Sequence, residues 1–268
     1  MKNKVVIITG ASSGIGKALS EEYAKIGAKT VMASRNYKKL EDISYNLKNK
    51  GADILLVQTD VSIEADCKNL IDKTVEKYGT IDILINNAGI SMRALFKDLD
   101  LIVIKRLMDV NFWGTVYCTK YALPYLLKNK GSVVGISSIA GFKGLPGRTG
   151  YSASKFAMNG FLETLRIENL KTGLNVLIAA PGFTETNVRK SALTADGSSQ
   201  EETPREEGQM MSAKRVALHI IKAVKKHRHT LIFTPIGKLE VLVNKFFPKL
   251  VDKLSYKYMA KEPDSPFK

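Results

Sequence analysis

Short runs of aliphatic and β-branched residues alternate with longer amphipathic segments along most of this chain. The runs that predict strands are Val5–Thr9, Thr30–Ala33, Asp53–Gln58, Ile83–Asn86, Ser132–Ser137, Asn175–Ala180 and Thr230–Phe233. Helical patterns lie between them, at Ile15–Lys25, Tyr37–Lys48, Glu64–Tyr78, Leu99–Leu127, Ser152–Asn169 and Ala213–Lys226. Such alternation favours right-handed crossovers and a parallel sheet with helices on both faces. We therefore expect a doubly wound α/β fold of Rossmann type, with about seven strands.

Neither the cysteines nor the apolar runs indicate secretion or a membrane span. Cys67 and Cys118 are too few for a disulfide framework and lack metal-ligand spacing, so we expect reduced thiols and no metal site. No run reaches the roughly 18–20 apolar residues that cross a bilayer. The apolar run near the N-terminus is too short for a signal peptide. The prediction is a cytoplasmic protein.

A glycine-rich turn follows the first predicted strand and opens the first predicted helix. It runs Thr9-Gly10-Ala11-Ser12-Ser13-Gly14-Ile15-Gly16. Glycines permit a tight turn and let backbone N–H groups approach a pyrophosphate at the positive end of a helix. The residues expected to bind a dinucleotide here are Gly10, Ser12, Ser13, Gly14, Ile15 and Gly16.

The end of the second predicted strand indicates which dinucleotide is bound. NAD-binding proteins generally carry an acid here that accepts hydrogen bonds from the ribose, whereas this chain has Ser34, Arg35 and Asn36. A guanidinium group can clamp the extra 2′-phosphate of NADP with forked hydrogen bonds. The sequence therefore favours NADP(H). The alternative is that Arg35 merely faces solvent.

The next two strand ends offer further cofactor contacts. Asp60 is a candidate acceptor for the adenine amino group, and Val61 is placed to line the adenine ring. The fourth predicted strand ends in Asn86-Asn87-Ala88-Gly89, whose small residues suit a chain that passes beside a cofactor. We expect contacts from Asn87, Ala88 and Gly89.

A tyrosine and a lysine stand four residues apart in Tyr151-Ser152-Ala153-Ser154-Lys155. On a helix these two side chains share one face. A free phenol has a pKa of about 10, and a nearby ammonium favours the phenolate, so Lys155 is expected to lower the pKa of Tyr151. Ser138 follows a predicted strand, where its hydroxyl is placed to hydrogen-bond a substrate carbonyl.

In combination these motifs resemble the short-chain dehydrogenase/reductase family, from Lys4 to about Phe233. The likeness rests on the glycine loop, the Asn86–Gly89 segment, and the residues Asn111, Ser138, Tyr151 and Lys155. It implies an oxidoreductase that moves hydride between nicotinamide and a carbonyl or alcohol. One position departs from the pattern, because many NADP-preferring members carry a basic residue where this chain has Ser13.

The resemblance also implies a role for each motif residue. Tyr151 exchanges a proton with the substrate oxygen, Ser138 polarises that oxygen, and Lys155 holds the nicotinamide ribose. Asn111 anchors a water that relays protons from Lys155. The segment after the sixth predicted strand resembles the family's nicotinamide loop, which implies cofactor contacts from Pro181, Gly182, Phe183, Thr184 and Thr186.

The expected substrate pocket is mostly apolar. Substrate contacts are assigned to Ser138, Ile139, Tyr151 and Phe183, and Met92, Arg93, Ala140, Phe142 and Leu145 are further lining candidates. These residues favour a hydrophobic ketone, aldehyde or secondary alcohol, although the same positions also suit core packing. The polar stretch at about 187–212 is expected to form a mobile lid.

The last segment of the chain is basic and amphipathic. The net charge is +15, and from Lys214 onward thirteen lysines and arginines stand against four acids. Apolar residues recur there at helical spacing, namely Leu239, Leu242, Val243, Phe246, Phe247, Leu250, Val251 and Leu254. We therefore divide the chain into a dinucleotide-binding catalytic domain, residues 1–236, and a helical C-terminal appendage, residues 237–268.

Three partners fit this apolar stripe: the chain's own domain or a second copy, an anionic membrane surface, or nucleic acid. Nucleic acid is disfavoured, because the basic residues accompany an apolar face rather than a polar groove. Peripheral membrane contact stays open, since lysine stems can lie along lipid with their charges in water. The family resemblance implies a homodimer or homotetramer formed through the helix of Tyr151.

The sequence therefore predicts an NADP(H)-dependent enzyme that reduces a hydrophobic ketone or aldehyde, or runs the reverse reaction. The alternative is a catalytically idle NADP(H)-binding sensor or scaffold, with or without membrane contact. The presence of Ser138, Tyr151, Lys155 and Asn111 together argues against an idle protein.

Overall fold

One parallel sheet organises the fold. The computed structural model describes residues 1–185, 191–201, 210–261 and 265. Seven strands lie in the order β3-β2-β1-β4-β5-β6-β9, and every pairing is parallel. Their bounds are β1 Val5–Thr9, β2 Lys29–Ser34, β3 Ile54–Gln58, β4 Ile83–Asn86, β5 Ser132–Ile136, β6 Asn175–Ala180 and β9 Thr230–Ile232. The chain winds outward to β3 and then returns to β4 beside β1, so the predicted doubly wound fold is confirmed.

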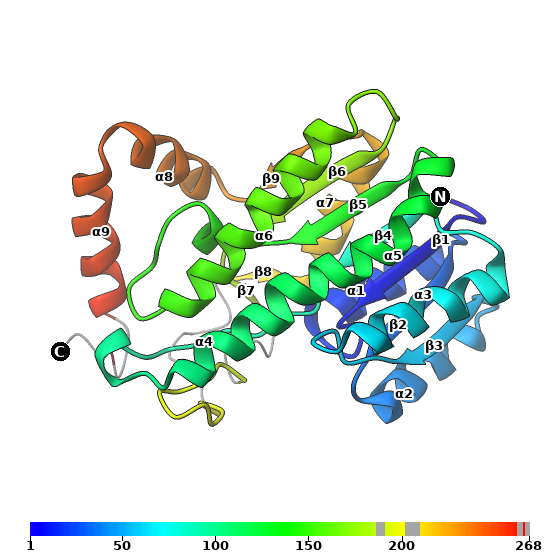
Figure 1. The fold of residues 1–268 in the computed structure, drawn as a ribbon, viewed down its shortest axis with the longest axis horizontal. Helices are drawn as coiled ribbons and strands as arrows, with labels where there is room; N and C mark the ends of the chain where they lie inside the picture. The colour runs from blue at the N-terminus through cyan, green and yellow to red at the C-terminus, as the bar shows by residue number, and fades with distance from the viewer. Residues whose placement is uncertain (186–190, 202–209, 262–264, 266–268) are drawn as a thin grey trace.

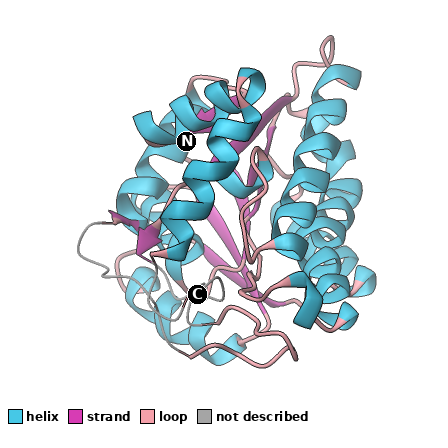
Figure 2. Cartoon of the chain, turned by 90° about the vertical axis from the view of Figure 1, so that its left-hand side faces the viewer, coloured by secondary structure: helices cyan, strands magenta, loops and turns pink. Residues whose placement is uncertain are grey.

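Helices cover both faces of the sheet, as Figure 2 shows. One layer holds α1 Gly14–Lys25, α2 Tyr37–Lys48 and α7 Ala213–Lys225, and the other holds α3 Glu64–Tyr78, α5 Gly114–Lys128 and α6 Thr149–Glu168. Successive strand residues point to opposite faces. Val6 and Ile8 therefore enter the core under α1, while Val5 and Ile7 enter the core under α5. Two buried faces explain why β1 is apolar at consecutive positions.

The single helix expected over Leu99–Leu127 is interrupted. A short helix, α4 Leu101–Leu107, leads into a π-helical turn at Met108–Trp113, and α5 begins directly after it. The π turn contains the fully buried Asn111, whose amide hydrogen-bonds another segment rather than its own helix. π turns of this kind concentrate at functional sites.

The chain ends in two helices, α8 Pro235–Phe246 and α9 Pro248–Ala260, which together we name the C-terminal hairpin. Each begins with a proline, which suits a first turn that needs no N–H donor. The Thr234 hydroxyl caps α8 by accepting a 3.0 Å hydrogen bond from the Gly237 N–H. In Figure 1 the hairpin stands at one end of the molecule, opposite α2 and β3. The division expected after residue 236 falls within the first turn of α8.

Candidate active site

A cavity of about 1650 Å³ opens at the carboxyl ends of the strands and is closed on one side by the C-terminal hairpin. In parallel α/β sheets this edge, at the point where the strand order reverses, is where ligands bind. Here the reversal lies between β1 and β4. Pockets for a single small molecule are usually about 300–1,000 Å³, so this cavity has room for a dinucleotide and a substrate side by side.

The glycine loop forms the floor of one end of the cavity, and Asn87 holds it in place. The Asn87 side-chain amide donates to the carbonyls of Thr9 at 2.8 Å and Gly10 at 3.2 Å. In return, the Thr9 hydroxyl accepts from the backbone N–H groups of Asn87 and Ala88, both at 3.0 Å. The ends of β1 and β4 are thereby joined, which fixes the shape of the loop before any ligand arrives.

Two glycines in this loop are required by close contacts. Gly10 has a φ of 65°, in the left-handed region, and a Cβ there would lie 2.9 Å from the Ala88 Cα. A Cβ on Gly16 would lie only 2.3 Å from the Gly10 carbonyl oxygen. Gly16 is buried and does not line the cavity, so its part is packing rather than the ligand contact predicted for it.

The loop fits the pyrophosphate of a dinucleotide. Within the described chain, the N-cap residue of α1, Ser13, makes no side-chain capping hydrogen bond. The first N–H groups of α1 therefore remain available to an anion at the positive end of the helix dipole. The predicted contacts Gly10, Ser12, Ser13, Gly14 and Ile15 all line the cavity.

The residues predicted to hold the adenosine half line the same cavity, namely Ser34, Arg35, Asn36, Asp60, Val61, Asn87, Ala88 and Gly89. Arg35 is exposed, and its carbonyl accepts a 3.2 Å hydrogen bond from the Gln58 side chain, which steadies the backbone behind the guanidinium. The Asp60 carboxylate accepts hydrogen bonds from the Ser62 N–H at 3.0 Å and hydroxyl at 2.7 Å.

Ser138, Tyr151 and Lys155 come together on the wall of the cavity. Ser138 follows β5 and hydrogen-bonds the Tyr151 hydroxyl, while its own oxygen accepts from the Ala140 N–H at 3.2 Å. Lys155, one turn after Tyr151 on α6, places its ammonium 5.9 Å from the centre of the Tyr151 ring. The same ammonium donates a 2.8 Å hydrogen bond to the Ile136 carbonyl.

The electrostatics of this group differ from the sequence-based expectation. Burial raises the pKa of Tyr151, and the hydrogen bond with Ser138 and the charge of Arg148 oppose that shift. Burial also lowers the pKa of Lys155 to about 8. The prediction that Lys155 lowers the pKa of Tyr151 is therefore wrong for this geometry: the cost of burying the phenolate outweighs the attractions, and the lysine is turned to Ile136.

Asn111 lies beneath the catalytic group rather than on the cavity wall. Its side chain accepts from the Ile90 N–H at 2.9 Å and donates to the Ile90 carbonyl at 3.0 Å and the Ser154 hydroxyl at 2.9 Å. A Cβ on Gly89 would meet both the Asn111 side-chain oxygen, at 3.1 Å, and the Lys155 ammonium, at 3.5 Å. Asn111 thus ties the chain after β4 to the helix that carries Tyr151 and Lys155.

The segment after β6 closes the end of the cavity that is predicted to hold the nicotinamide. Its predicted contacts Pro181, Gly182, Phe183 and Thr184 all line the cavity, and Thr186 lies outside the described residues. The Phe183 ring lies 6.4 Å from the ring of Tyr258 on α9. The C-terminal hairpin therefore lies against this side of the cavity.

The substrate end of the cavity agrees in part with the sequence-based candidates. Ile139, Leu145 and Phe183 line it, whereas Met92, Arg93, Ala140 and Phe142 do not. Met92 is instead fully buried in a core with Val103, Leu107 and Leu193. The largest omission from the candidates was the C-terminal hairpin, which contributes Ile236, Leu239, Val243, Val251, Leu254, Tyr258 and Met259. Their helical periodicity was visible in the sequence, but not the side of the molecule to which they fold.

The described part of the predicted lid is anchored. Residues 191–201 run beside the chain that follows β4, where Leu193 donates to the Ser91 carbonyl and accepts from the Arg93 N–H, both at 2.8 Å. Met210 and Met211 border the cavity just before α7, and Met211–Ser212 pairs with Thr184–Glu185 as the two short strands β8 and β7. Residues 187–190 and 202–209 of that lid lie outside the described residues.

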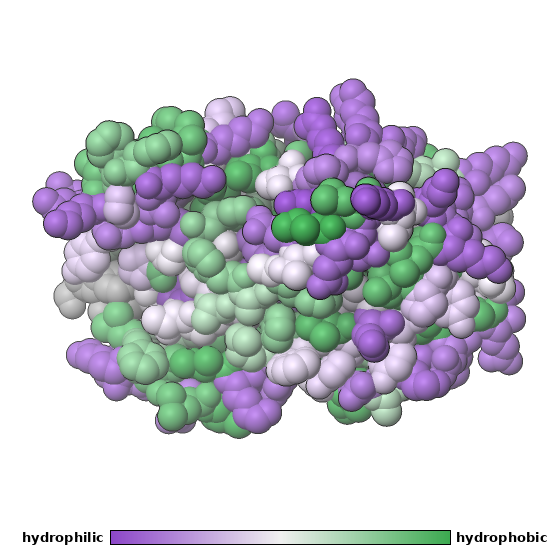
Figure 3. All heavy atoms as spheres, turned by 45° about the horizontal axis from the view of Figure 1, so that its top comes forward, coloured by the Kyte–Doolittle hydropathy of each residue, from purple (hydrophilic) through white to green (hydrophobic). Residues whose placement is uncertain are grey.

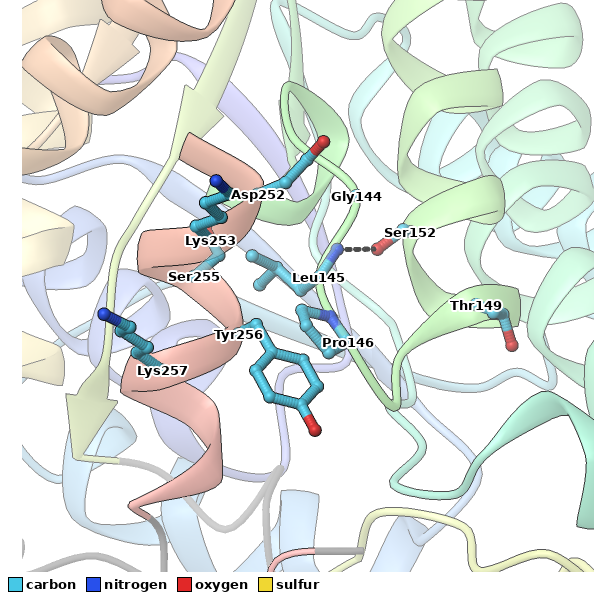
Figure 4. Close-up of a pocket in the computed structure, with 10 residues that line it drawn as sticks. All are labelled: Gly144, Leu145, Pro146, Thr149, Ser152, Asp252, Lys253, Ser255, Tyr256 and Lys257. Carbon is cyan, nitrogen blue, oxygen red and sulfur yellow. Dashed lines mark hydrogen bonds between the residues drawn. The ribbon is translucent and has the colours of Figure 1, made fainter. Parts of the chain in front are cut away.

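The C-terminal hairpin is joined to the body of the protein by an ion pair between Lys143 and Asp252. The Lys143 side chain is nearly buried in the loop after β5, and Asp252 belongs to α9. Beside this contact a smaller groove of about 750 Å³ separates α9 from the loop Gly144–Pro146, as Figure 4 shows. The loop is steadied on its other side by a 3.3 Å hydrogen bond from the Leu145 N–H to the Ser152 hydroxyl.

Known dehydrogenases are similar to this chain in sequence. The family model described as short chain dehydrogenase matches residues 4–197. A Dictyostelium discoideum protein named dehydrogenase/reductase SDR family protein 7-like is 37% identical over 97% of this chain and 83% of its own length. An Arabidopsis thaliana protein named 11-beta-hydroxysteroid dehydrogenase-like 2 is 43% identical over 69% of this chain, which spans 60% of that relative.

Solved structures share the fold. A short-chain dehydrogenase/reductase from Burkholderia phymatum in complex with NAD has a TM-score of 0.83 and 24% identity, with 93% of this chain and 95% of that one covered. An alcohol dehydrogenase from Thermococcus sibiricus complexed with 5-hydroxy-NADP has a TM-score of 0.76 and 25% identity, with 87% and 96% covered. Since the family model spans more than half of the sequence, the chain belongs to the short-chain dehydrogenase family.

Proposed function

We propose that this protein is an NADP(H)-dependent oxidoreductase that reduces a hydrophobic ketone or aldehyde, or oxidises the matching alcohol. The observation that carries the proposal is the convergence of Ser138, Tyr151 and Lys155 on one cavity with the glycine loop at its other end. Membership of an oxidoreductase family supports the reaction class. The proposed choice of cofactor and of substrate rests on the residues of this chain rather than on the family.

The three side chains divide the proton chemistry between them. The nicotinamide, when bound, supplies or accepts the hydride. The Tyr151 hydroxyl donates its proton to the carbonyl oxygen during reduction, and the Ser138 hydroxyl donates a hydrogen bond that orients and polarises that oxygen. The raised pKa of Tyr151 keeps it protonated at neutral pH, which suits an acid in the direction of reduction. Lys155 is placed to hold the ribose hydroxyls and to replace the proton.

NADP(H) is proposed over NAD(H) because of the residues at the end of β2. Ser34, Arg35 and Asn36 line the cavity there, and none of them carries a carboxylate. An exposed guanidinium at this point attracts a 2′-phosphate, whereas an NAD-binding protein needs an acceptor for the ribose hydroxyls. The solved neighbours hold one cofactor of each kind, so the choice rests on Arg35.

The proposed substrate is a bulky apolar ketone or alcohol of about steroid size. Apolar side chains of the sheet end and of the C-terminal hairpin border the space next to Tyr151, among them Ile139, Leu145, Phe183, Leu239, Val243 and Leu254. Relatives named 11-beta-hydroxysteroid dehydrogenase, at 40% identity in Sesamum indicum and 42% in Arachis hypogaea, favour a substrate of this class. This chain spans only 53% and 56% of those two relatives.

A homodimer through α5 and α6 is part of the proposal. Trp113, directly before α5, and Phe156, on α6, are exposed, and the Trp113 ring packs against Phe112 at 5.3 Å and Tyr117 at 5.6 Å between ring centres. Aromatic residues in such a group are typical of protein interfaces. Replacement of Trp113 and Phe156 by serine is expected to halve the mass measured by sedimentation velocity; an unchanged mass would reject this interface.

The test of the activity is the Tyr151→Phe variant. This change removes one oxygen atom and leaves the ring that packs in the site. We expect NADPH oxidation with a panel of ketosteroids, long-chain ketones and small aldehydes to fall by about 10²–10⁴-fold. NADPH binding, measured by fluorescence titration, should change little. Turnover equal to that of the unmodified protein would reject Tyr151 as the proton donor, and failure of the unmodified protein to bind NADPH would reject the cofactor.

A further inference from the structure

The outer surface of the C-terminal hairpin is unusually apolar. Nine of the twenty-one exposed large apolar side chains of the described residues lie on α8, on α9 or at Phe247 between them, a segment that forms only about a tenth of the described chain. Ile236 is 79% exposed, Phe246 71% and Phe247 64%. Figure 3 shows hydrophobic residues gathered, with hydrophilic ones between them, at the end of the molecule where Figure 1 draws the hairpin. Exposed apolar surface of this density marks an interaction site.

Lysines border the apolar residues on both helices. On α8, Leu242 is one turn from both Lys238 and Lys245, and on α9, Leu250 and Leu254 are each one turn from a lysine. All six lysines from Lys238 to Lys261 are exposed. The two acids of this region are engaged elsewhere, because Asp252 pairs with Lys143 and Glu240 is half-buried against Ser255. The hairpin therefore presents an apolar strip with a cationic rim.

This combination fits an anionic bilayer better than a second copy of the chain. An isologous contact places the same patch of both copies face to face. The lysine rims would then oppose each other, while the described acids of the hairpin, Glu240 and Asp252, are engaged elsewhere. At a membrane the same lysines reach the lipid phosphates while their aliphatic stems lie along the acyl chains. The hairpin face and its charge are thus complementary to acidic lipid.

The dimensions of the helices indicate a surface contact rather than a span. The helices α8 and α9 have 12 and 13 residues. At about 1.5 Å per residue each is about 20 Å long or less, against a hydrocarbon core of about 30 Å. Among the described residues, no helix is long and apolar enough to traverse a bilayer. Amphipathic helices of this kind lie in the plane of the lipid headgroups.

We propose that the C-terminal hairpin docks the protein on the surface of an anionic phospholipid membrane, with its exposed apolar residues in the headgroup layer. Leu239 and Leu254 are exposed and also border the cavity. Docking therefore brings the open side of the cavity to the lipid, where apolar ketones and alcohols accumulate. The docking itself does not depend on the proposed activity.

The experiment is sedimentation of the full chain with phosphatidylcholine vesicles, with and without about one-third phosphatidylglycerol. We expect tight binding to the anionic vesicles, weak binding to the neutral ones, and weakening by salt. Two double variants on the docking face, Phe246→Gln with Leu250→Gln and Lys245→Glu with Lys249→Glu, avoid residues that line either cavity. Each should reduce the vesicle partition coefficient by roughly tenfold or more.

Matched variants at other exposed positions separate docking through the hairpin from nonspecific binding by the rest of the surface. Ile167→Gln with Leu170→Gln removes two exposed apolar side chains at the end of α6, and Lys48→Glu with Lys50→Glu makes the same charge change at the end of α2. Both controls should bind anionic vesicles like the unmodified protein. Thermal unfolding midpoints show whether all four variants are folded, which keeps the comparison independent of enzyme activity.

Three results would overturn the proposal. The first is no binding of the unmodified protein to anionic vesicles. The second is an equal loss of binding in the control variants, which would show that the binding is not specific to the hairpin. The third is a change of subunit number in the Phe246→Gln with Leu250→Gln variant without any loss of lipid binding, which would assign the face to a second copy of the chain.

Discussion

The Lys155 ammonium lies 5.9 Å from the centre of the Tyr151 ring, yet its hydrogen bond is to the Ile136 carbonyl at 2.8 Å. The two side chains share one wall of the cavity, but the lysine is held by the backbone at the end of β5. The lysine is nearly inaccessible to solvent, and burial lowers its pKa from 10.5 to about 8. A buried amine of this kind lowers the stability of the fold, because burial disfavours its charged form.

The first prediction concerns the pH dependence of stability in Lys155→Met. Between pH 8 and 10.5 the unfolded chain binds more protons at this position than the folded chain, so folding stability rises with pH there. The cost of burying the charge is therefore full below pH 8 and gone above pH 10.5. We expect Lys155→Met to stabilise the fold by about 1–2 kcal/mol at neutral pH, after the loss of one hydrogen bond is included.

The measurement is urea unfolding of the two proteins at several pH values. The gain should shrink as the pH rises through this range, while NADPH oxidation is lost throughout. Lys120→Met, at an exposed position on α5, is the control and should show no such trend. A gain that stays constant with pH would disprove the assignment to the buried charge.

The second prediction concerns cofactor choice at Arg35. Arg35→Gln removes the charge that attracts the 2′-phosphate, and we expect the ratio of kcat/KM for NADPH over NADH to fall by about 10–100-fold. Arg35→Asp also supplies an acceptor for the ribose hydroxyls, so it should raise kcat/KM for NADH as well. Steady-state kinetics with one apolar ketone measures both. Undiminished preference for NADPH in both variants would show that Arg35 only faces solvent.

The third prediction makes the same substitution, glycine to alanine, at two positions. We expect it to lower the stability of the fold at one and to raise it at the other. A methyl group on Gly16 meets the Gly10 carbonyl at 2.3 Å, so Gly16→Ala must displace the loop. We expect a destabilisation of about 1–3 kcal/mol and weaker NADPH binding. Gly160 lies inside α6 with nothing within 4 Å of an added Cβ, and Gly160→Ala should stabilise by about 0.5–1 kcal/mol. Chemical unfolding of both variants checks the pair, and a shift of the same sign in both would contradict the packing argument.

The fourth prediction tests the ion pair that fastens the C-terminal hairpin. Asp252→Ala leaves the nearly buried Lys143 without its carboxylate, which loosens α9 from the loop after β5. We expect faster limited proteolysis near residues 233–235 and a several-fold higher KM for a bulky ketone, with kcat little changed. Lys143→Met combined with Asp252→Ala removes both charges and should be milder. Equal behaviour of Asp252→Ala and the unmodified protein would mean that the pair does not fasten the hairpin.

The residue patterns of the sequence alone were sufficient to predict the sheet and most of the helices that cover it. The helices over Tyr37–Lys48 and Glu64–Tyr78 have the bounds that periodicity predicted. The strand ends carry the expected polar residues because a parallel sheet buries its strands on both faces and leaves the chemistry to their termini. Gly10 and Asn87 also follow predicted strands, so the sequence identified them as candidate site residues for the same reason.

What the sequence could not show depended on contacts between distant residues. Asn111, in the π turn, makes hydrogen bonds to Ile90, which lies 21 residues earlier in the chain. The pKa of Tyr151 depends on its burial, which no i, i+4 spacing reveals. The apolar stripe of α8 was evident in the sequence. Its position beside the cavity depends on the turn at Thr234 and on the ion pair between Asp252 and Lys143.

The position of the C-terminal hairpin on one side of the cavity has a consequence for evolution. Most of the described residues that border the glycine-loop end of the cavity come from the first 184 positions, whereas the hairpin that borders the opposite end starts at Pro235. Mutations in the hairpin are therefore expected to alter substrate choice while the residues proposed to bind the cofactor stay unchanged. A library randomised only at Leu239, Val243 and Leu254 samples that freedom directly.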